Sequence, residues 1–536
     1  METLATSIPT SAVTTPLGKD EKKALLEKLL QQKLQQSVQH APMSKGQESL
    51  WFVHQNDPHS AAYNVASAIR IYSAVDTNAF TRALNQCIQR HAALRTSYAI
   101  KDGKNIQVIN PGTPLALIRR DLSAFTDTEV QQIITADYQQ PFNLTQLPVM
   151  RAHWYDLANG EAVFMLVVHH IAFDAWSLWI LMEELSEIYQ ALSTNRVPQL
   201  PAQAPAYREY AQQQTQWLAS EKGESAKQYW LKKLAGDIHP LTLNISKPRP
   251  RIQTFNGASH YFQLAPELAQ AINALARSCG VTANSLLLAA FYTLLYRHSA
   301  QEDICIASPT AGRTSGEFAR TLGYFVNPVI LRTQLAANNL FVDVLEQVNT
   351  SLLEALEYQE YPFSSLIEAL NPKRDPSYTP LSQVSFVFQK PQQNDGLNSA
   401  WVPGQQGPKI NWAGVEIAQF PLNQQEGQFE LELEIVDTKG RFYGIFKYNR
   451  DIFSAQHMRM LENHLRELLQ GIVVNPANEI GRLPMITAQE LEQFQQWNNT
   501  AVVYPTHRNL HELIEQQVAK APQLPAVRFE NTQLTY

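Results

Sequence analysis

A buried strand that ends in two histidines is the feature of this sequence that most constrains its fold. Residues 162–170 read AVFMLVVHH, a continuous apolar run that stops at His169 and His170. An uninterrupted apolar run of this length is typical of a strand buried on both faces of a sheet. After a short IAFD segment comes AWSLWILMEELSEIYQAL, which has a strong helical pattern. The sequence therefore predicts a strand, a turn and a helix, with polar groups at the strand end.

Ionisable side chains gather in this turn, at His169, His170 and Asp174 of the run HHIAFDAWS. Imidazole suits proton transfer because its ordinary pKa is the closest to neutrality. The same residues could instead form a hydrogen-bonded cluster at a strand end, without a chemical role. Zinc binding is the weakest interpretation because no HExxH motif or further His/Cys pair accompanies them. The sequence also lacks the GxSxG, P-loop and Rossmann signatures.

Helices and strands alternate along the rest of the chain, which predicts an α/β (α+β) fold. They recur in a similar order in each half, and two lobes of about 200 residues fit domain sizes better than one core. Helices are expected at residues 77–90, 207–218, 265–277, 284–296, 341–358 and 455–469, strands at 303–308 and 327–334, and a hairpin from Phe429 that turns at Lys439 and Gly440.

The ends of the chain differ from this globular part. Residues 1–18 predict a flexible tail, and residues 19–36 predict an amphipathic leucine helix for packing or for docking another polypeptide. Residues 483–506 predict a linker, after which residues 507–536 begin another domain. The net charge of −6 argues against a nucleic-acid or anionic-membrane surface. Without a signal peptide or paired cysteines, a cytoplasmic location is expected.

HHIAFDAWS resembles the HHxxxDG motif of nonribosomal peptide synthetase condensation domains, relatives of chloramphenicol acetyltransferase. Further segments resemble the other motifs of that family and occur in the same order. They include MSKGQESLWFVHQ, RHAALRTSY, YREY, ASPTAGR, LGYFVNPVILR, YQEYPFSSLIEAL and RDPSYTPLSQVSFVFQ, between residues 43 and 389. The segment from residue 507 resembles the start of an adenylation domain.

The resemblance implies a V-shaped pair of chloramphenicol acetyltransferase-like lobes with mixed sheets and flanking helices, here residues 40–225 and 226–482. It implies an active-site tunnel that two phosphopantetheine arms of carrier proteins enter from opposite faces, and no cofactor bound by the domain itself. An amide would form as the acceptor amine attacks the upstream thioester. The Met1 start suggests a donor carrier on a separate polypeptide, with the acceptor carrier and the adenylation domain in cis.

The resemblance also implies roles for individual residues. His170 matches the catalytic histidine, which either accepts the amine proton or positions the amine. His169 matches the first histidine of the motif, a supporting residue. Asp174 matches the aspartate, which is structural through a salt bridge to a second-lobe arginine, and Arg313 is the best match for that arginine.

The sequence departs from the family pattern at several positions. Ala175 replaces the glycine of the motif; it would be strained at positive φ but harmless at a helix start. Trp176, which follows it, is expected in the core. Lys45 and Gly46 replace the more usual residues before Gln47, and Tyr358 stands where histidine is common. None of these changes removes a catalytic group.

Other functions remain open from the sequence. Epimerization domains share the motif but follow a carrier protein, and heterocyclization domains have aspartate in place of His169. A starter or ester-forming variant and a non-catalytic recruitment platform are the remaining alternatives. Residues 46–55 and 60–66 look like those of condensation domains that accept acyl or polyketide-derived donors, which suggests a natural-product pathway of peptide or hybrid polyketide–peptide type.

Overall fold

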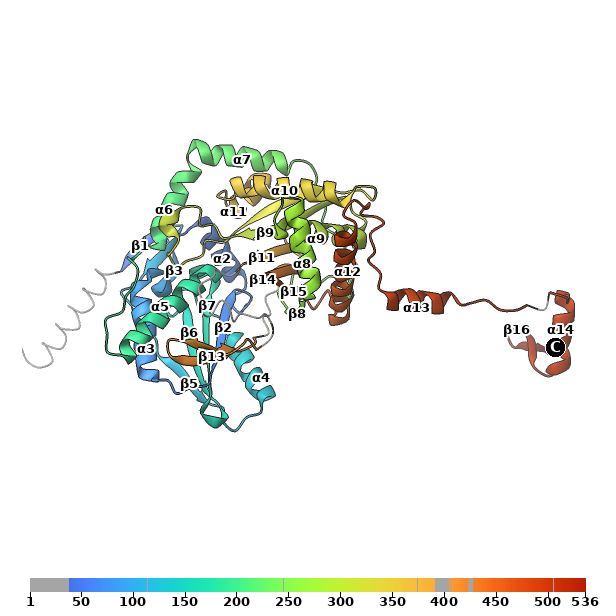
Figure 1. Cartoon of the computed structure of the whole chain (residues 1–536). Coiled ribbons are helices and arrows are strands. Elements are labelled where there is room, and N and C mark those ends of the chain that lie inside the picture. The colour runs from blue at the N-terminus through green and yellow to red at the C-terminus, as the bar shows by residue number, and fades with distance from the viewer. Residues whose placement is uncertain are drawn as a thin grey trace, which may run out of the picture. The chain divides into compact units, whose positions relative to one another are not determined.

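Two six-stranded sheets form the framework of Met1–Met485, the larger of two units in the chain. The computed structural model describes residues 38–536 except 113, 244, 374, 391–403, 405, 423–427 and 505. The expected tail (1–18) and leucine helix (19–36) lie outside the described residues. Figure 1 shows the sheets with their helices.

The first sheet has the predicted apolar strand, β7 (Ala162–His169), near its centre. Every residue of β7 is buried, because α3 (Thr77–Arg90) and α5 (Ala175–Ser193) pack on one face and α4 (Asp127–Tyr138) packs on the other. The strand order is β12 (Ile410–Trp412), β13 (Val415–Gln419), β2 (Asn64–Ile71), β7, β6 (Met150–Asp156) and β5 (Leu117–Asp121). Only the β5–β6 pair is parallel among these neighbours.

The second sheet is covered by helices that share one large apolar core with it. These helices are α8 (Pro266–Ser278), α9 (Ala283–Ser299), α10 (Phe341–Glu357) and α12 (Ala455–Val474). The strand order is β10 (Asn327–Gln334), β9 (Asp303–Thr310), β11 (Val384–Gln389), β14 (Leu431–Thr438), β15 (Arg441–Asn449) and β8 (Gly257–Gln263). The expected hairpin is β14–β15, which turns at Lys439 and Gly440, both with positive φ.

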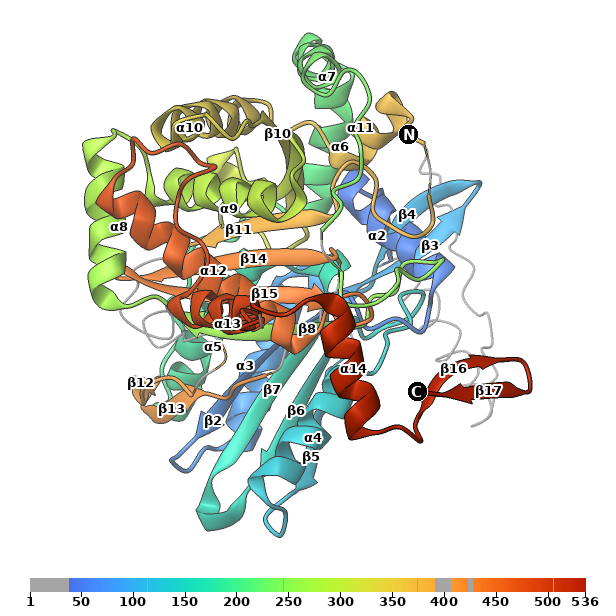
Figure 2. The ribbon, with the colours of Figure 1, turned by 90° about the vertical axis from the view of Figure 1, so that its right-hand side faces the viewer.

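The second half of the sequence contributes two strands to the first lobe. Strands β12 and β13 come from the second half of the sequence but extend the first sheet beside β2 (Figure 2). The predicted boundary between residues 225 and 226 falls inside α7 (Glu221–Lys233), whose Trp230 lies in the core of the second lobe. The exact lobe boundaries therefore stay a prediction, and the first sheet includes strands from beyond them.

The remaining elements connect the lobes and cover their surfaces. They are β1 (Gln39–Pro42), β3 (Thr96–Lys101) and β4 (Lys104–Ile109), which form a small sheet, together with α2 (Lys45–Asn56), α6 (Tyr207–Leu218) and α11 (Phe363–Leu370). The helices expected at 77–90 and 207–218 are confirmed to the residue.

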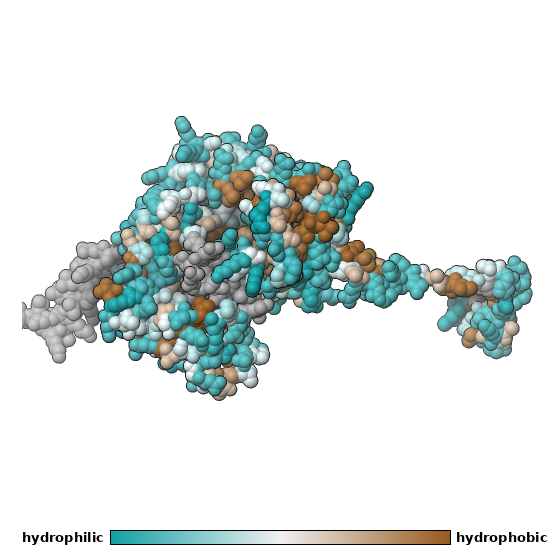
Figure 3. All heavy atoms as spheres, viewed as in Figure 1, coloured by the Kyte–Doolittle hydropathy of each residue, from teal (hydrophilic) through white to brown (hydrophobic). Residues whose placement is uncertain are grey.

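The surface of the larger unit is mostly hydrophilic in the view of Figure 3, with hydrophobic patches over the region of α9 and α10. Leu353 and Leu356 of α10 are among the exposed apolar residues. Within the described residues, no single helix is long and apolar enough to cross a membrane. Only α8 and α9 taken together, bent by 105°, meet that criterion, and the middle of α9 is buried in the core.

The smaller unit, Ile486–Tyr536, contains two helices and a hairpin. They are α13 (Ala488–Asn498), α14 (Leu510–Lys520), β16 (Pro525–Phe529) and β17 (Thr532–Thr535). The helix and strand pair expected after residue 507 are confirmed, while their assignment to an adenylation domain stays a prediction. Neither helix contains a buried residue.

Candidate active site

His170 begins a short 3-10 turn, His170–Ala172 (η3), directly after the buried strand β7. The carbonyl of Ile171 in this turn accepts hydrogen bonds from the amide of Gln47 (3.1 Å) and the hydroxyl of Tyr98 (3.2 Å). Both donors are buried. Two of the motifs recognised in the sequence therefore meet beneath the turn and fix the backbone that carries His170.

The imidazole of His170 is held in one tautomer. Its Nδ1 lies 2.6 Å from the carbonyl oxygen of Phe173, and because a carbonyl can only accept, Nδ1 carries the hydrogen. Burial lowers the pKa of His170, and the charge of Lys447 lowers it further, against the opposing effects of the Phe173 hydrogen bond and Asp174. The ring is therefore neutral at pH 7, with the lone pair of Nε2 available as a base.

His169 has the opposite arrangement. Its Nδ1 accepts a hydrogen bond from the N–H of Ile171 at 3.2 Å, so this nitrogen carries no hydrogen. The ring is only 5% exposed and packs near His54 and Phe142. Burial, with smaller contributions from His170 and His54, lowers the pKa of His169 to about 3. His169 is therefore a neutral residue whose Nδ1 is bonded to the backbone of the turn.

Asp174 lies at the centre of a buried polar network. Both of its carboxylate oxygens bind the guanidinium of Arg313, at 2.7 and 3.0 Å, and the two side chains are 1% and 3% exposed. Asp174 also caps α5 by accepting from the N–H and hydroxyl of Ser177, each at 2.7 Å. The structure thus brings together the aspartate and arginine that the sequence analysis paired across 139 positions.

The network attaches a segment of the second lobe, residues 311–326, to the start of α5. The hydroxyl oxygen of Ser177 accepts from the N–H of Gly323 at 3.1 Å and lies 3.1 Å from the Gly323 carbonyl oxygen, while its single hydrogen is donated to the nearer carboxylate of Asp174. The indole of Trp176 donates to the carbonyl of Ala319 at 2.9 Å. Trp176 is half-buried and packs against the first-lobe core, so it joins the two lobes as well as filling space.

Ala175 is the first residue of α5, directly after the N-cap Asp174. It is not among the described residues with positive φ. Of the two possibilities raised by the sequence, the helix-start interpretation is therefore correct, and alanine is unstrained at this position.

Several residues that shape this site were not predicted from the sequence. Phe173 supplies the carbonyl that fixes His170, Ser177 links the lobes, and Tyr324 lies edge-on to His170 with ring centroids 4.9 Å apart. Ser177 and Tyr324 lie inside recognised motifs, so their position in a motif was the available signal. A backbone carbonyl leaves no comparable mark in a sequence.

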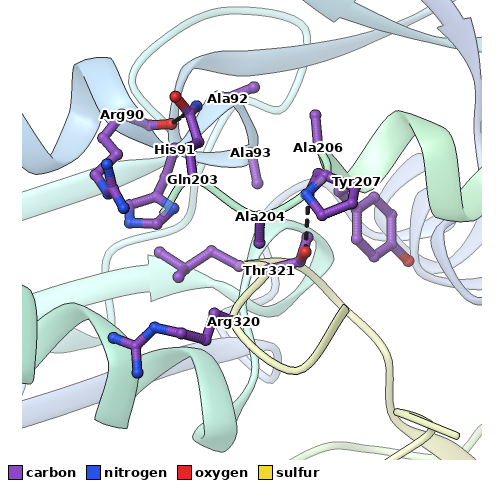
Figure 4. Close-up of a pocket in the computed structure, with 12 residues that line it drawn as sticks. Arg90, His91, Ala92, Ala93, Gln203, Ala204, Ala206, Tyr207, Arg320 and Thr321 are labelled. Atoms are coloured by element: carbon purple, nitrogen blue, oxygen red, sulfur yellow. Dashed lines mark hydrogen bonds between the residues drawn. The ribbon is translucent and has the colours of Figure 1, made fainter. Parts of the chain in front are cut away.

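A small hollow lies between residues 90–93, the segment 203–207 and residues 320–322 (Figure 4). Its volume is about 30 Å³, which is room for one or two water molecules. Arg90, His91 and Arg320 are among its lining residues, and all three side chains pair with Glu184 on α5. This hollow is too small for a substrate, so its residues are assigned to the contact between the lobes.

Comparisons with known proteins agree with this architecture. A model of the Condensation domain family matches residues 37–494. A linear gramicidin synthase subunit from Brevibacillus parabrevis is 35% identical over 93% of this chain, and chondramide synthase cmdD of Chondromyces crocatus is 32% identical over 92%. The chain spans only 6% and 12% of the lengths of these two relatives.

Solved structures share the fold. A four-domain nonribosomal peptide synthetase, holo-AB3403, superposes with a TM-score of 0.82 at 26% identity, over 93% of this chain and 38% of that one. The first condensation domain of the calcium-dependent antibiotic synthetase superposes with a TM-score of 0.70 at 19% identity, over 84% of this chain and all of that one.

The fold is the two-lobe chloramphenicol acetyltransferase-like architecture, which confirms the expected class. The chain belongs to the condensation domain family of nonribosomal peptide synthetases.

Proposed function

We propose that this domain forms an amide between two carrier-bound substrates and that His170 serves the acceptor amine. The observation that carries the proposal is the tautomer of His170: Nδ1 donates to Phe173, so Nε2 is left as a neutral acceptor at the end of β7. Asp174 is engaged by Arg313 and Ser177. In this proposal Asp174 has a structural role, and His169 supports the turn that carries His170.

In the proposed step, the amine nitrogen of the acceptor attacks the carbonyl carbon of the donor thioester. Nε2 of His170 orients the amine and accepts its proton as the carbon–nitrogen bond forms. The carbon–sulfur bond then breaks, and the proton leaves with the donor thiol. The products are an amide on the acceptor carrier and a free phosphopantetheine thiol on the donor carrier, so the step needs no oxidant or further reactant.

The proposed partners are two carrier proteins that deliver phosphopantetheine thioesters, with an adenylation domain serving the acceptor. The domain itself is proposed to bind no cofactor. For the donor we propose an acyl or polyketide-type chain delivered from a separate polypeptide. The acyl assignment rests on the resemblance of residues 46–55 and 60–66 to domains with such donors, and a peptidyl chain is the alternative.

A transfer assay tests the proposal. Donor carriers loaded with acetyl, 3-oxobutanoyl or L-phenylalanyl groups are mixed with acceptor carriers loaded with glycine, L-alanine or L-leucine. Intact-protein mass spectrometry then follows the mass of the acceptor carrier. We expect amide transfer in at least one pair, with acyl donors preferred in direct competition. No transfer from any pair would overturn the function, and preference for the phenylalanyl donor would overturn the acyl assignment alone.

The rate of transfer should depend on pH through two groups. The acceptor α-amine has an ordinary pKa of about 8, so its deprotonation limits the rate below that pH. His170, whose pKa is lowered below its ordinary 6.5, adds a second requirement only at more acid pH. We expect a plot of log rate against pH to be level above about pH 8, to have a slope of about one between about pH 6.5 and 8, and to be steeper at more acid pH. In His170→Gln the slope should stay near one at every pH below about 8, and identical profiles would contradict the assignment.

A further inference from the structure

Gly46, one of the departures from the family pattern, lies against the ring of Tyr324. A Cβ atom placed on Gly46 would be 2.8 Å from Cε1 and 3.0 Å from Cδ1 of that ring. Carbon atoms in contact are ordinarily about 3.5–4.0 Å apart. Any side chain at position 46 must therefore displace Tyr324, although Gly46 itself is in the first turn of α2 and carries no functional group.

The backbone around Tyr324 is held firmly. Its carbonyl accepts a hydrogen bond from the hydroxyl of Tyr207. The N–H of Gly323 donates to Ser177 at 3.1 Å, and the N–H of Phe325 donates to Asp174 at 3.2 Å. Since both neighbours are tied to α5, the Asp174 network fixes the point from which the Tyr324 side chain projects.

From that point the ring of Tyr324 meets His170 edge-on. The ring centroids are 4.9 Å apart and the planes cross at 78°, a favourable aromatic geometry. The hydrogen bond from Nδ1 to the Phe173 carbonyl is a second contact that fixes the imidazole. The imidazole is thus held between a hydrogen bond and an aromatic edge.

We propose that Tyr324 is a positioning residue that holds the imidazole of His170 in its reactive orientation, and that Gly46 provides the space it needs. The inference rests on the proposed role of His170 as the residue that serves the amine. On this proposal the Asp174–Arg313 network has an indirect effect on His170: it fixes the backbone on both sides of Tyr324, and the Tyr324 ring in turn contacts the imidazole. A misplacement of about 1 Å at a catalytic group can lower a rate by about 10²-fold, so a small displacement of this ring has a measurable consequence.

The test uses Gly46→Ala, Tyr324→Ala, Tyr324→Phe and the double variant Gly46→Ala/Tyr324→Ala in the transfer assay, with the carrier pair that the wild type uses best. Gly46→Ala and Tyr324→Ala should each lower kcat about 10- to 100-fold, with KM for the acceptor carrier changed little. Tyr324→Phe keeps the ring and should regain most of that loss. The double variant should be no slower than Tyr324→Ala alone, because the alanine at position 46 then has no ring to displace.

Gly316→Ala is the matched control, because a Cβ at Gly316 meets no atom within 4 Å and this glycine lies in the same second-lobe segment. Losses that multiply in the double variant, or wild-type kcat in Gly46→Ala, would overturn the inference. Should Tyr324→Ala fail to fold, Tyr324→Leu replaces it in the double variant. The kcat of Gly46→Ala alone then decides whether displacement of the Tyr324 ring impairs catalysis.

A second readout needs no substrate. The ¹³Cε1 NMR signal of His170, assigned by its loss in His170→Gln, should shift in Gly46→Ala and Tyr324→Ala and stay in place in Gly316→Ala. Its titration midpoint should rise in Tyr324→Ala, since loss of the ring admits water and burial is the main cause of the lowered pKa. An unmoved signal would overturn the inference. If His170→Ala transfers normally, the proposed role of His170 fails, and the NMR result still decides whether Tyr324 holds the ring.

Discussion

Replacement of His170 by alanine is expected to lower the rate of amide transfer by about 10²–10⁴-fold, the usual contribution of a positioned acid–base group. The physical reason is the loss of Nε2, the nitrogen left basic by the hydrogen bond from Nδ1 to Phe173. The fold should survive, because His170 is only half-buried and its backbone bonds do not depend on the side chain. Single-turnover transfer between loaded carriers, together with a thermal melt, measures both effects.

Two controls make this result specific. His59→Ala removes an exposed imidazole elsewhere in the first lobe and should leave both rate and melting unchanged. His169→Ala should reduce stability as well as rate, because it removes the acceptor for the N–H of Ile171. A His170→Ala protein that transfers within a few-fold of wild type would eliminate His170 as the base and favour a non-catalytic recruitment role.

Asp174→Ala should have the largest effect on stability. The change leaves the guanidinium of Arg313, which is 3% exposed, without its carboxylate, and breaking one side of a buried pair costs about 3–5 kcal/mol. Loss of the N-cap of α5 adds about 1 kcal/mol. We expect a clear fall in the urea midpoint of unfolding, accompanied by loss of transfer.

The matched control is Arg482→Ala, which breaks an ion pair with Glu479 whose arginine side chain is 80% exposed. Such surface pairs contribute about 0–1 kcal/mol, so this variant should unfold almost like the wild type. If Asp174→Ala were as stable as the wild type but inactive, Asp174 would take part in the chemistry, and the structural role assigned to it would be wrong.

Much of the local structure could be predicted because its causes are local. The helix at 77–90 and the polar helix at 207–218 were predicted from their own residues, and the apolar run before His170 was enough to predict β7 as a buried strand. The Asp174–Arg313 pair came from resemblance, since nothing in the spacing of 139 residues specifies it.

Long-range packing was harder to predict. Strand β13 pairs with the edge of β2 and so joins residues near 417 to residues near 71. Only a few residues form this ladder, so the sequence contains little that predicts the pairing. The contact of Tyr324 with His170 depends on the absence of a Cβ at Gly46, and these three residues lie in three separate segments of the chain. The tautomer of His170 depends on a backbone carbonyl, which every residue possesses.

The crossing strands have a consequence for any attempt to recombine this domain with its relatives. A fragment ending between the lobes would lack β13, so the eight-residue strand β2 would become a bare sheet edge able to pair with other chains. It would also lose Trp412 and Ile417 from one face of the first core, and Phe420 from the other. The lobes are therefore not exchangeable modules cut at one point: a chimera must transfer residues 410–422 together with the first lobe that they complete.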